Sequence, residues 1–462
     1  MTLPHSTARE LDGIDLGDAR LDRRAQQIAA RVGCDPSKSF PKLVEDPSEL
    51  EALYRFFQND RVEPSDILRP HQVATAKRCG AHAVTRVAHD TCAFRFDGDR
   101  EGMGPLARNG TGFYAHFALA IGDGEMRAPL GVVGIDDFVR SEIRERLSPS
   151  ARTKKTRLTP REEKESAKWM RSVTAAEEAL SHPAVIHVMD READDYTLLA
   201  ELIAKGRRFV IRGHAERRLE HGGEKLCERL QGASAVFFRT VVLADRTKPK
   251  KGHAARRERS ATLSVRSAGV EICKTVSAQT DVPSIVLNVV NVFEAMPPPG
   301  EEPIEWTLLT TEPIDSAAAV EAIVDHYRSR WRVEEYFRAL KSGCSVEQRQ
   351  LDDREALVRV LAIFAPIAWR LLAMRTLSRL EKPPPASTLF DDDDLRAVRF
   401  LAKKRKHPIP ATPTVRDVML ALAAAGGHLK RNGDPGWITI GRGYDDFILV
   451  REVLAGVREH GL

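Results

Sequence analysis

One stretch of the sequence, residues 327–341, places chemically active side chains along one expected helix. It contains no Pro or Gly, and Asp315 and Ser316 ahead of it are typical of a helix start. At about 100° per residue, an arc of roughly 60° on this helix carries Tyr327, Arg330, Glu334 and Lys341. A carboxylate can hold a divalent metal, while a phenol and two cations can bind phosphate oxygens. Taken alone, the stripe is more simply explained as a solvated charged face.

Two further carboxylates follow expected strands. The strand expected at 83–88 ends at His89-Asp90, and the short apolar strand at 184–189 ends at Asp190. Together with Glu334, these carboxylates would suit two metal ions that activate a water or a 3′-hydroxyl in phosphodiester chemistry. Each Asp alone is more simply explained as a turn former or a helix cap.

Other carboxylates compete for these roles. None of them has the first-strand position of Asp90, although they also lie near strand ends: Asp97, Asp99, Asp136 and Asp137. Glu335 lies about 100° around the helix from Glu334, away from the Tyr-Arg-Lys side. Glu192 and Asp194 can serve as supporting groups or as charges at a helix N-terminus.

The chain has 462 residues, enough for two or three domains. Residues 1–70 are expected to be helical and carry several arginines, so they could lie on DNA or dock onto the main domain. Expected strands follow at 83–88, 92–96, 113–121 and 129–134, then a helix at 161–179 and a β-α-β unit over 184–212. A β-rich segment occupies 213–300, and helices are expected at 355–380, 415–425 and 444–455, with an acidic loop at 391–394.

Composition gives weaker constraints. The net charge is +5, and basic residues gather in two runs, at 152–161 and 246–259, which suit a nucleic-acid backbone or a solvated loop equally well. The six cysteines are scattered without a C-x-x-C pair, which argues against a zinc site and a disulfide framework. The N-terminus has no apolar signal core and no run approaches membrane-spanning length, so we expect a cytoplasmic protein with no membrane contact.

The order of these motifs resembles a family of bacterial insertion-sequence DDE transposases. The spacing Tyr-x2-Arg-x3-Glu-x6-Lys is similar to that family's signature. His89-Asp90-Thr91 and Asp190-Arg-Glu-Ala-Asp194 resemble the segments around its first and second catalytic Asp. Residues 303–310, 16–21, 52–57 and the Gly-Gly and Pro-Gly-Trp segment near the C-terminus also resemble parts of the family, so the similarity runs in order along nearly the whole chain.

The resemblance implies an α/β fold, with a ribonuclease H-like mixed-sheet catalytic core at 71–375 interrupted by a β-rich insertion at about 213–300. The flanking regions would be a helical DNA-binding domain at 1–70 and a helical dimerisation domain at 376–462. Asp90, Asp190 and Glu334 would bind two Mg²⁺ ions, with Mn²⁺ able to substitute. Phosphates at the transposon end would be held by Tyr327, Arg330 and Lys341, and a flipped base would stack on Trp306. Arg212 would be a further DNA contact.

The function so implied is cut-and-paste transposition, in which a homodimer nicks double-stranded transposon ends, forms and reopens a hairpin, and joins the 3′-hydroxyl to target DNA. Four alternatives stay open at this point. The chain could be a silent or domesticated DNA-end-binding relative, or a stand-alone metal-dependent endonuclease. Trp306 could be a core aromatic, and the apolar stripe at 357–380 could be core instead of a dimer surface.

Overall fold

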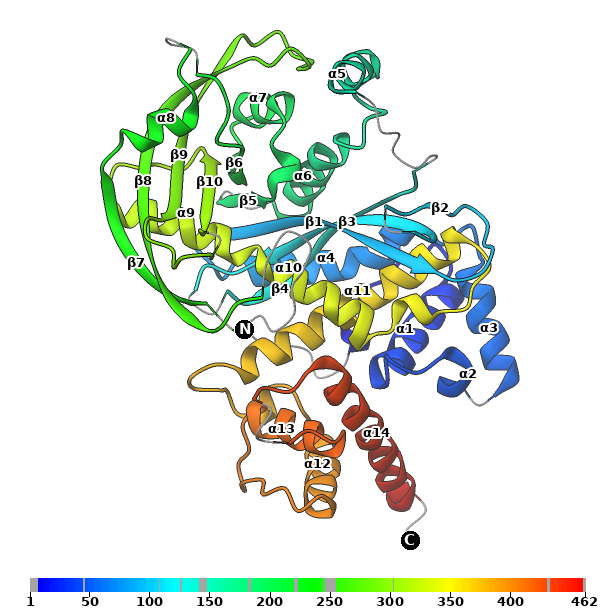
Figure 1. The fold of residues 1–462 in the computed structure, drawn as a ribbon. Coiled ribbons are helices and arrows are strands. Elements are labelled where there is room, and N and C mark those ends of the chain that lie inside the picture. The colour runs from blue at the N-terminus through cyan, green and yellow to red at the C-terminus, as the bar shows by residue number, and fades with distance from the viewer. Residues whose placement is uncertain are drawn as a thin grey trace.

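The computed structural model describes residues 7–44, 46–107, 109–124, 127–140, 148–181, 184–219, 223–243, 245, 255–301, 303–429 and 433–459. One sheet of ten strands runs through the molecule and carries helices on both faces (Figure 1). The strands are β1 (Thr85–Phe96), β2 (Gly104–Pro105), β3 (Thr111–Ile121), β4 (Pro129–Phe138), β5 (Val185–Met189), β6 (Arg208–Arg212), β7 (Ala235–Leu243), β8 (Arg259–Cys273), β9 (Ser284–Glu294) and β10 (Glu305–Thr310).

The first half of the sheet has the predicted ribonuclease H-like order. β4 pairs antiparallel with β3, and β3 pairs antiparallel with β1. β1, β5 and β6 then lie parallel to one another. The fold class predicted from the sequence, a mixed-sheet α/β core with helical regions at both ends, is therefore confirmed.

The β-rich insertion continues this sheet. β10 pairs antiparallel with β6, and β9, β8 and β7 follow in that order to the far edge. The insertion also carries a short helix, α8 (Leu226–Gln231). Because its strands are hydrogen-bonded through β10 to β6, the insertion and the core share one backbone framework.

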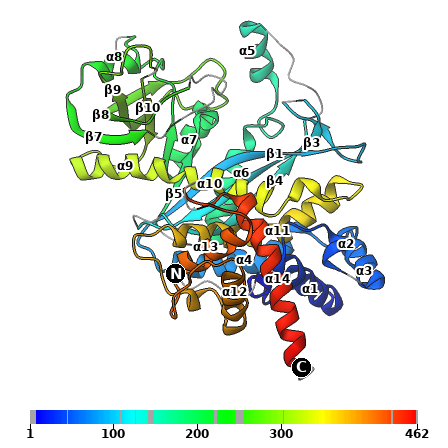
Figure 2. The same cartoon turned by 60° about the horizontal axis from the view of Figure 1, so that its bottom comes forward.

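The helices are distributed over both faces and both ends of the sheet. One face is covered by α9 (Ala317–Ser329), α10 (Trp331–Arg338) and α11 (Arg354–Ser378). The opposite face carries α6 (Ala167–Leu180) and α7 (Tyr196–Ala204). The N-terminal helices are α1 (Ala19–Cys34), α2 (Phe40–Leu43), α3 (Pro47–Phe57) and α4 (Pro64–Cys79). The C-terminal ones are α12 (Asp392–Lys404), α13 (Val415–Ala425) and α14 (Trp437–Glu459), and Figure 2 shows α14 extending from the body toward the C-terminus.

A single buried cluster joins the N-terminal helices, the sheet and the C-terminal helices. It includes Phe57 of α3, Phe117 of β3, Trp369 of α11 and Leu422 of α13, all fully buried. The two domain boundaries predicted at residues 70 and 375 both fall inside helices, α4 and α11. The three predicted regions therefore share one core, and their division into domains stays a prediction.

The apolar stripe at 357–380 belongs to this core. Most side chains of α11 are buried, so the stripe is not available for dimerisation. Among the described helices, α11 has the length and the apolar composition that a membrane-spanning helix needs. The expectation that no run approaches that length was therefore wrong. Its most apolar window is 94% buried inside the fold, as in many core helices.

Two predicted elements need correction. The strand predicted to end at His89-Asp90 continues to Phe96, because β1 pairs with β3 from Arg86 to Phe96 without a break. Asp90 thus lies in the middle of a strand. The acidic stretch predicted as a loop instead begins α12: Asp391 caps the helix, and the next three Asp occupy its first turn, where the helix dipole favours negative charge.

Two further boundaries differ from prediction. The helix expected from residue 161 begins only at Ala167. The basic run at 152–161 lies mostly in a helix of its own, α5 (Pro149–Leu158), on which Lys154 and Arg157 are exposed. In the second basic run, residues 246–254 lie outside the described residues.

Candidate active site

The strand register places the two predicted aspartates, Asp90 and Asp190, on one face of the sheet. Ala88 pairs with Val188, and Val188 pairs with Val210, so these three side chains point the same way. Since side chains alternate along a strand, Asp90 points to the same face as Ala88, and Asp190, just beyond the end of β5, follows the same alternation.

The register extends this face into β10. Arg212 at the end of β6 lies opposite Leu308, and Trp306 shares a face with Leu308. The apolar residues of this face, among them Val188, Val210 and Leu308, form a cluster with Val320 and Tyr327 of α9. The helix that carries the signature therefore covers the face to which the strand residues point.

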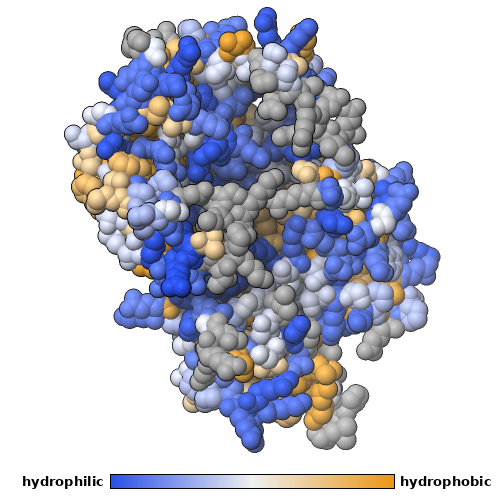
Figure 3. All heavy atoms as spheres, viewed as in Figure 1, coloured by the Kyte–Doolittle hydropathy of each residue, from blue (hydrophilic) through white to orange (hydrophobic). Residues whose placement is uncertain are grey.

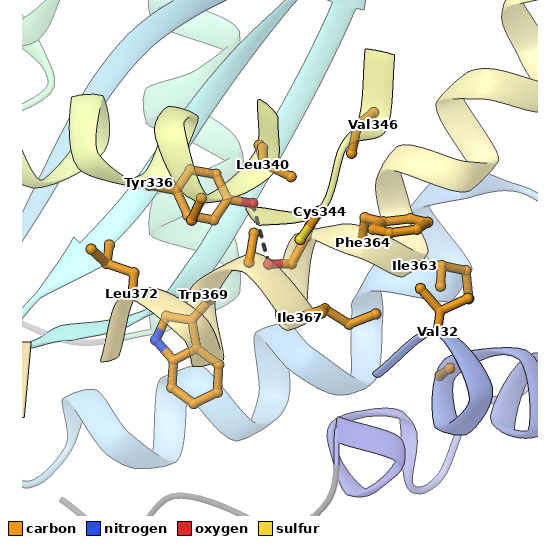
Figure 4. Packing of buried hydrophobic residues seen from close by; sticks show 14 of the residues in the cluster. Val32, Tyr336, Leu340, Cys344, Val346, Ile363, Phe364, Ile367, Trp369 and Leu372 are labelled. Carbon is orange, nitrogen blue, oxygen red and sulfur yellow. Dashed lines mark hydrogen bonds between the residues drawn. The ribbon is translucent and has the colours of Figure 1, made fainter. Parts of the chain in front are cut away.

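The signature segment is not one regular helix. α9 ends at Ser329, α10 begins at Trp331, and Arg330 lies at the joint. After α10, residues Ala339–Gly343 form a π-helical turn. The inner side of α10 is fixed by packing on α11, where Tyr336 donates a hydrogen bond to the Ala365 carbonyl over 3.2 Å (Figure 4). This packing holds the opposite side of α10 toward β1.

Arg330 joins two of the three predicted carboxylates. Its Nη1 lies 2.8 Å from Oδ2 of Asp90, and its Nη2 lies 2.8 Å from Oε1 of Glu334. The Arg330 side chain is only 14% exposed. Burial lowers its pKa, but Asp90, Tyr327 and Glu334 outweigh this and raise it, so the guanidinium is a permanent cation between the two acids.

The surroundings of Asp90 disfavour its charged form. Burial raises the pKa of its carboxyl to about 6, and the charges of Asp190 and Glu334 act in the same direction. Arg330 opposes them without cancelling them. Asp190 and Glu334 therefore lie close enough to Asp90 for their charges to act on it.

Asp190 also has the structural role that was its simpler explanation. Its Oδ1 accepts a hydrogen bond from the Glu192 backbone N–H over 2.8 Å and caps a short 3₁₀ turn, Arg191–Ala193. A carboxylate has a second oxygen and several lone pairs, so this cap is compatible with a further ligand.

The donor set suits a divalent cation, but the arrangement is not a preformed metal site. Within the described residues, no group of three or more His, Cys, Asp or Glu side chains is placed to hold a metal ion. Carboxylate oxygens are the ligands that Mg²⁺ prefers, and a bound cation would offset the repulsion of Asp90 by Asp190 and Glu334. The guanidinium of Arg330 lies between two of these donors, so it must leave before both can bind a metal.

Lys341 also reaches β1, at a residue beyond Asp90. Its Nζ donates to the Ala93 carbonyl and lies 2.9 Å from Oε1 of Glu347, further along β1 than Asp90. A π-helical turn changes the rotation per residue, so this turn sets the direction of Lys341, and its place on one narrow arc with Arg330 and Glu334 stays a prediction. Glu347 was not singled out in the sequence, because its pairing depends on this irregular turn.

Tyr327 and Trp306 contact each other across α9 and β10. Their ring centroids lie 5.7 Å apart with an interplanar angle of 61°, an edge-to-face arrangement. Tyr327 is only 7% exposed, whereas Trp306 is partly buried. Tyr327 therefore supports Trp306, a role that its position in the signature does not reveal.

Arg212 lies beside the same strand. Its Nη2 donates to the Glu305 carbonyl over 3.3 Å, and its Nε is buried without a hydrogen-bond partner in the described part of the chain. A buried N–H without a partner is uncommon in folded proteins.

The competing acids have other partners or none nearby. Glu335 is buried and pairs with Arg332 and Arg379, which confirms that it points away from Glu334. Asp136 pairs with Arg171, and Asp137 with Arg354. Asp97 is 96% exposed. Asp194 forms a buried pair with Arg217 and fixes the chain beyond β6 to the turn that Asp190 caps.

Comparison with known proteins matches two parts of the chain. A family described as "Transposase DNA-binding" matches residues 6–62, and one described as "Transposase DDE domain" matches residues 158–365. The chain is a DDE transposase. DDE transposase domains use divalent metal ions, typically Mg²⁺, and the partner of this transposase is DNA. Asp190 and Glu334 lie inside the DDE match, while Asp90 lies between the two matches.

A solved structure is also similar to this transposase. It is the cryo-EM structure of the piggyBac transposase synaptic complex with hairpin DNA. The two chains are 12% identical, the similarity covers 78% of this chain and 67% of that one, and the TM-score is 0.36.

Proposed function

We propose that this transposase moves a bacterial insertion sequence by cut-and-paste transposition, with Asp90, Asp190 and Glu334 as its catalytic acids. The observation that supports this most is the meeting of Asp90 from β1 and Glu334 from α10 on one guanidinium, with Asp190 close enough to raise the pKa of Asp90. This contact between β1 and α10, with Asp190 near Asp90, is what supports the proposed set of acids.

The reaction would be a series of in-line phosphoryl transfers. In the first, water attacks a phosphorus at the transposon end, the bond to the 3′-oxygen breaks, and a 3′-hydroxyl is released. That hydroxyl then attacks the opposite strand and displaces its 3′-oxygen, which closes a hairpin. Water reopens the hairpin, and the 3′-hydroxyl finally attacks a phosphodiester of the target.

The three acids would hold two Mg²⁺ ions, or Mn²⁺ in their place. Such ions, when bound, activate the attacking oxygen and stabilise the leaving one. The chain's own residues would orient the DNA: Arg330 through a forked contact with one phosphate, and Lys341 with a phosphate further along β1. Tyr327 would act mainly through Trp306.

Trp306 and Arg212 would act on the DNA end itself. Trp306 is partly buried, and its edge-to-face contact with Tyr327 fixes the ring, so a base turned out of the helix could stack on its free side. The guanidinium of Arg212 would donate a hydrogen bond to a phosphate oxygen of the DNA. Exposed arginines of the N-terminal helices, Arg20, Arg23 and Arg31, would bind the duplex away from the site.

We propose a homodimer built through α14. Exposed apolar side chains at a helical spacing of four, Leu449, Val453 and Val457, follow one side of this helix, with Leu454 beside them. Figure 3 shows hydrophobic surface in this region. A stripe of this kind fits pairing with a second copy, and it replaces the buried stripe of α11 in that role.

The decisive test is cleavage of a labelled duplex that carries the element's terminal repeat, with Mg²⁺ or EDTA, on a denaturing gel. Wild-type protein should give a nick followed by a hairpin only with metal. Asp90→Ala, Asp190→Ala and Glu334→Ala should each reduce cleavage below about one-thousandth of the wild-type rate while retaining end binding. Asp97→Ala, at an exposed acid outside the site, is the matched control.

Each other outcome would reject part of the proposal. Cleavage retained by Glu334→Ala would remove that residue from the catalytic set. Binding without any cut by wild-type protein would identify a silent relative, and cutting without a hairpin would identify a stand-alone nuclease.

A further inference from the structure

Arg330 occupies the position that a cation would take between Asp90 and Glu334. Each of its terminal nitrogens contacts a different carboxylate, both over 2.8 Å. Both acids are also partly sheltered, with side-chain exposures of 19% for Asp90 and 29% for Glu334. Ion pairs in such surroundings are much stronger than exposed ones. An incoming metal ion must therefore compete with the arginine of the chain itself.

The backbone at Arg330 allows this side chain to be exchanged without moving a helix. Arg330 belongs to neither α9 nor α10, and its own N–H bonds to the Tyr327 carbonyl in a tighter, 3₁₀-like turn. The helices on both sides are held by buried residues, Val324 before the joint and Tyr336 after it. Rotation about the side-chain bonds of Arg330 is then enough to free both acids.

We propose that Arg330 is an exchangeable internal cation, which closes the site in the free protein and is drawn away by a DNA phosphate so that metal can bind. This inference rests on the proposed function, since it takes the three acids as the metal ligands. A phosphate is a suitable competitor because it accepts the forked contact of a guanidinium as a carboxylate does.

The exchange would couple DNA binding to metal binding. If only the fraction of molecules with Arg330 displaced can bind metal, the apparent affinity is lowered by that fraction. A DNA end that holds Arg330 raises the fraction, and by linkage bound metal must then strengthen DNA binding equally. A transposase molecule that is not bound to a transposon end would therefore hold little metal in its site.

The test is a Mn²⁺ titration of the full chain without DNA, followed by electron paramagnetic resonance of the free ion. Arg330→Gln keeps a polar side chain but removes the charge, and it should bind Mn²⁺ about tenfold more tightly than wild type. Arg330→Lys, which keeps a cation but loses the fork, should lie between the two. The matched control is Arg328→Gln, two residues away on α9, where the arginine pairs with Asp325 and not with the acids of the site. It should match wild type.

A terminal-repeat duplex should then raise the affinity of wild type for Mn²⁺ more than that of Arg330→Gln. Equal or weaker Mn²⁺ binding by both Arg330 variants without DNA would overturn the proposal, and the Lys variant keeps the test valid if the Gln variant does not fold. If wild type cuts DNA but Arg330→Gln binds Mn²⁺ no more tightly than wild type, the exchange of Arg330 is rejected and the proposed function stands. Absence of Mn²⁺ binding in every variant would reject the proposed function.

Discussion

At the scale of single residues, Asp90 is the acid whose ionisation the fold makes unfavourable. Burial and the neighbouring acids raise the pKa of its carboxyl to about 6, from an ordinary value of 3.8. The folded chain therefore binds this proton more tightly than the unfolded chain does. The stability that the proton contributes is fully present below about pH 4 and is lost as the pH rises through about 6.

Asp90→Asn should consequently become more favourable relative to wild type as the pH rises, because Asn resembles the protonated acid. In metal-free buffer, the difference in unfolding free energy between variant and wild type should shift by up to about 3 kcal/mol between pH 4 and pH 7.5. Denaturant melts at both pH values measure it. Asp97→Asn, at an exposed acid, should show no such shift. A difference independent of pH for Asp90→Asn would show that its charge is not repelled in the folded state.

The residues of the candidate site can be named from the sequence, but their contacts cannot. The spacing of Arg330 and Glu334 predicts a shared side of a helix, and the structure has them paired. Nothing in that spacing says that the same guanidinium also reaches Asp90, 240 positions earlier in the chain. Such a contact depends on the packing of α10 against β1, which only the fold determines.

At the scale of elements, irregular turns explain what the sequence pattern missed. Regular rotation predicts Lys341 on the same side as Glu334, but its partners, Ala93 and Glu347, depend on the π-helical turn at Ala339–Gly343, which the spacing does not predict. Similarly, the polar His89-Asp90 pair suggests the end of a strand, although pairing with β3 carries β1 on to Phe96. By contrast, the short apolar strand expected at 184–189 agrees closely with β5, because its apolar run is not interrupted.

The contact between α13 and α14 gives a prediction at this scale. Gly443 of α14 lies so close to α13 that an added Cβ would overlap the Leu422 carbonyl oxygen, whereas a Cβ at Gly441 would meet nothing within 4 Å. Gly443→Ala should therefore destabilise the chain by about 1–3 kcal/mol despite the better helix propensity of Ala. Gly441→Ala on the same helix should stabilise it by about 0.5–1 kcal/mol. Thermal or denaturant unfolding compares the two, and equal effects would mean that the helices do not pack this closely.

At the scale of the whole molecule, the strand order follows from the sequence better than the boundaries between its parts. A β-α-β unit with strands at 184–189 and 208–212 predicts parallel neighbours, and β5 and β6 are parallel. The division into three domains has no comparable signal. The N-terminal helices, α11 and the C-terminal helices contribute to one buried cluster, and periodicity within each helix cannot show which other helix it will meet.

The exposed stripe of α14 leads to the last prediction. The first turns of α14 are fixed by Gly443 against α13, while its second half exposes Leu449, Val453 and Val457. If a second copy covers these side chains, Leu449→Glu with Val453→Glu places unpaired charges in the interface and should shift the protein to a monomer. Light scattering with a terminal-repeat duplex measures the change. Because the catalytic site lies on other elements, the variant should still bind a single end but lose paired-end cleavage. The matched control is Phe400→Glu, at an exposed apolar residue of α12 outside the stripe. A Leu449/Val453 variant that still pairs two ends would show that the dimer forms elsewhere.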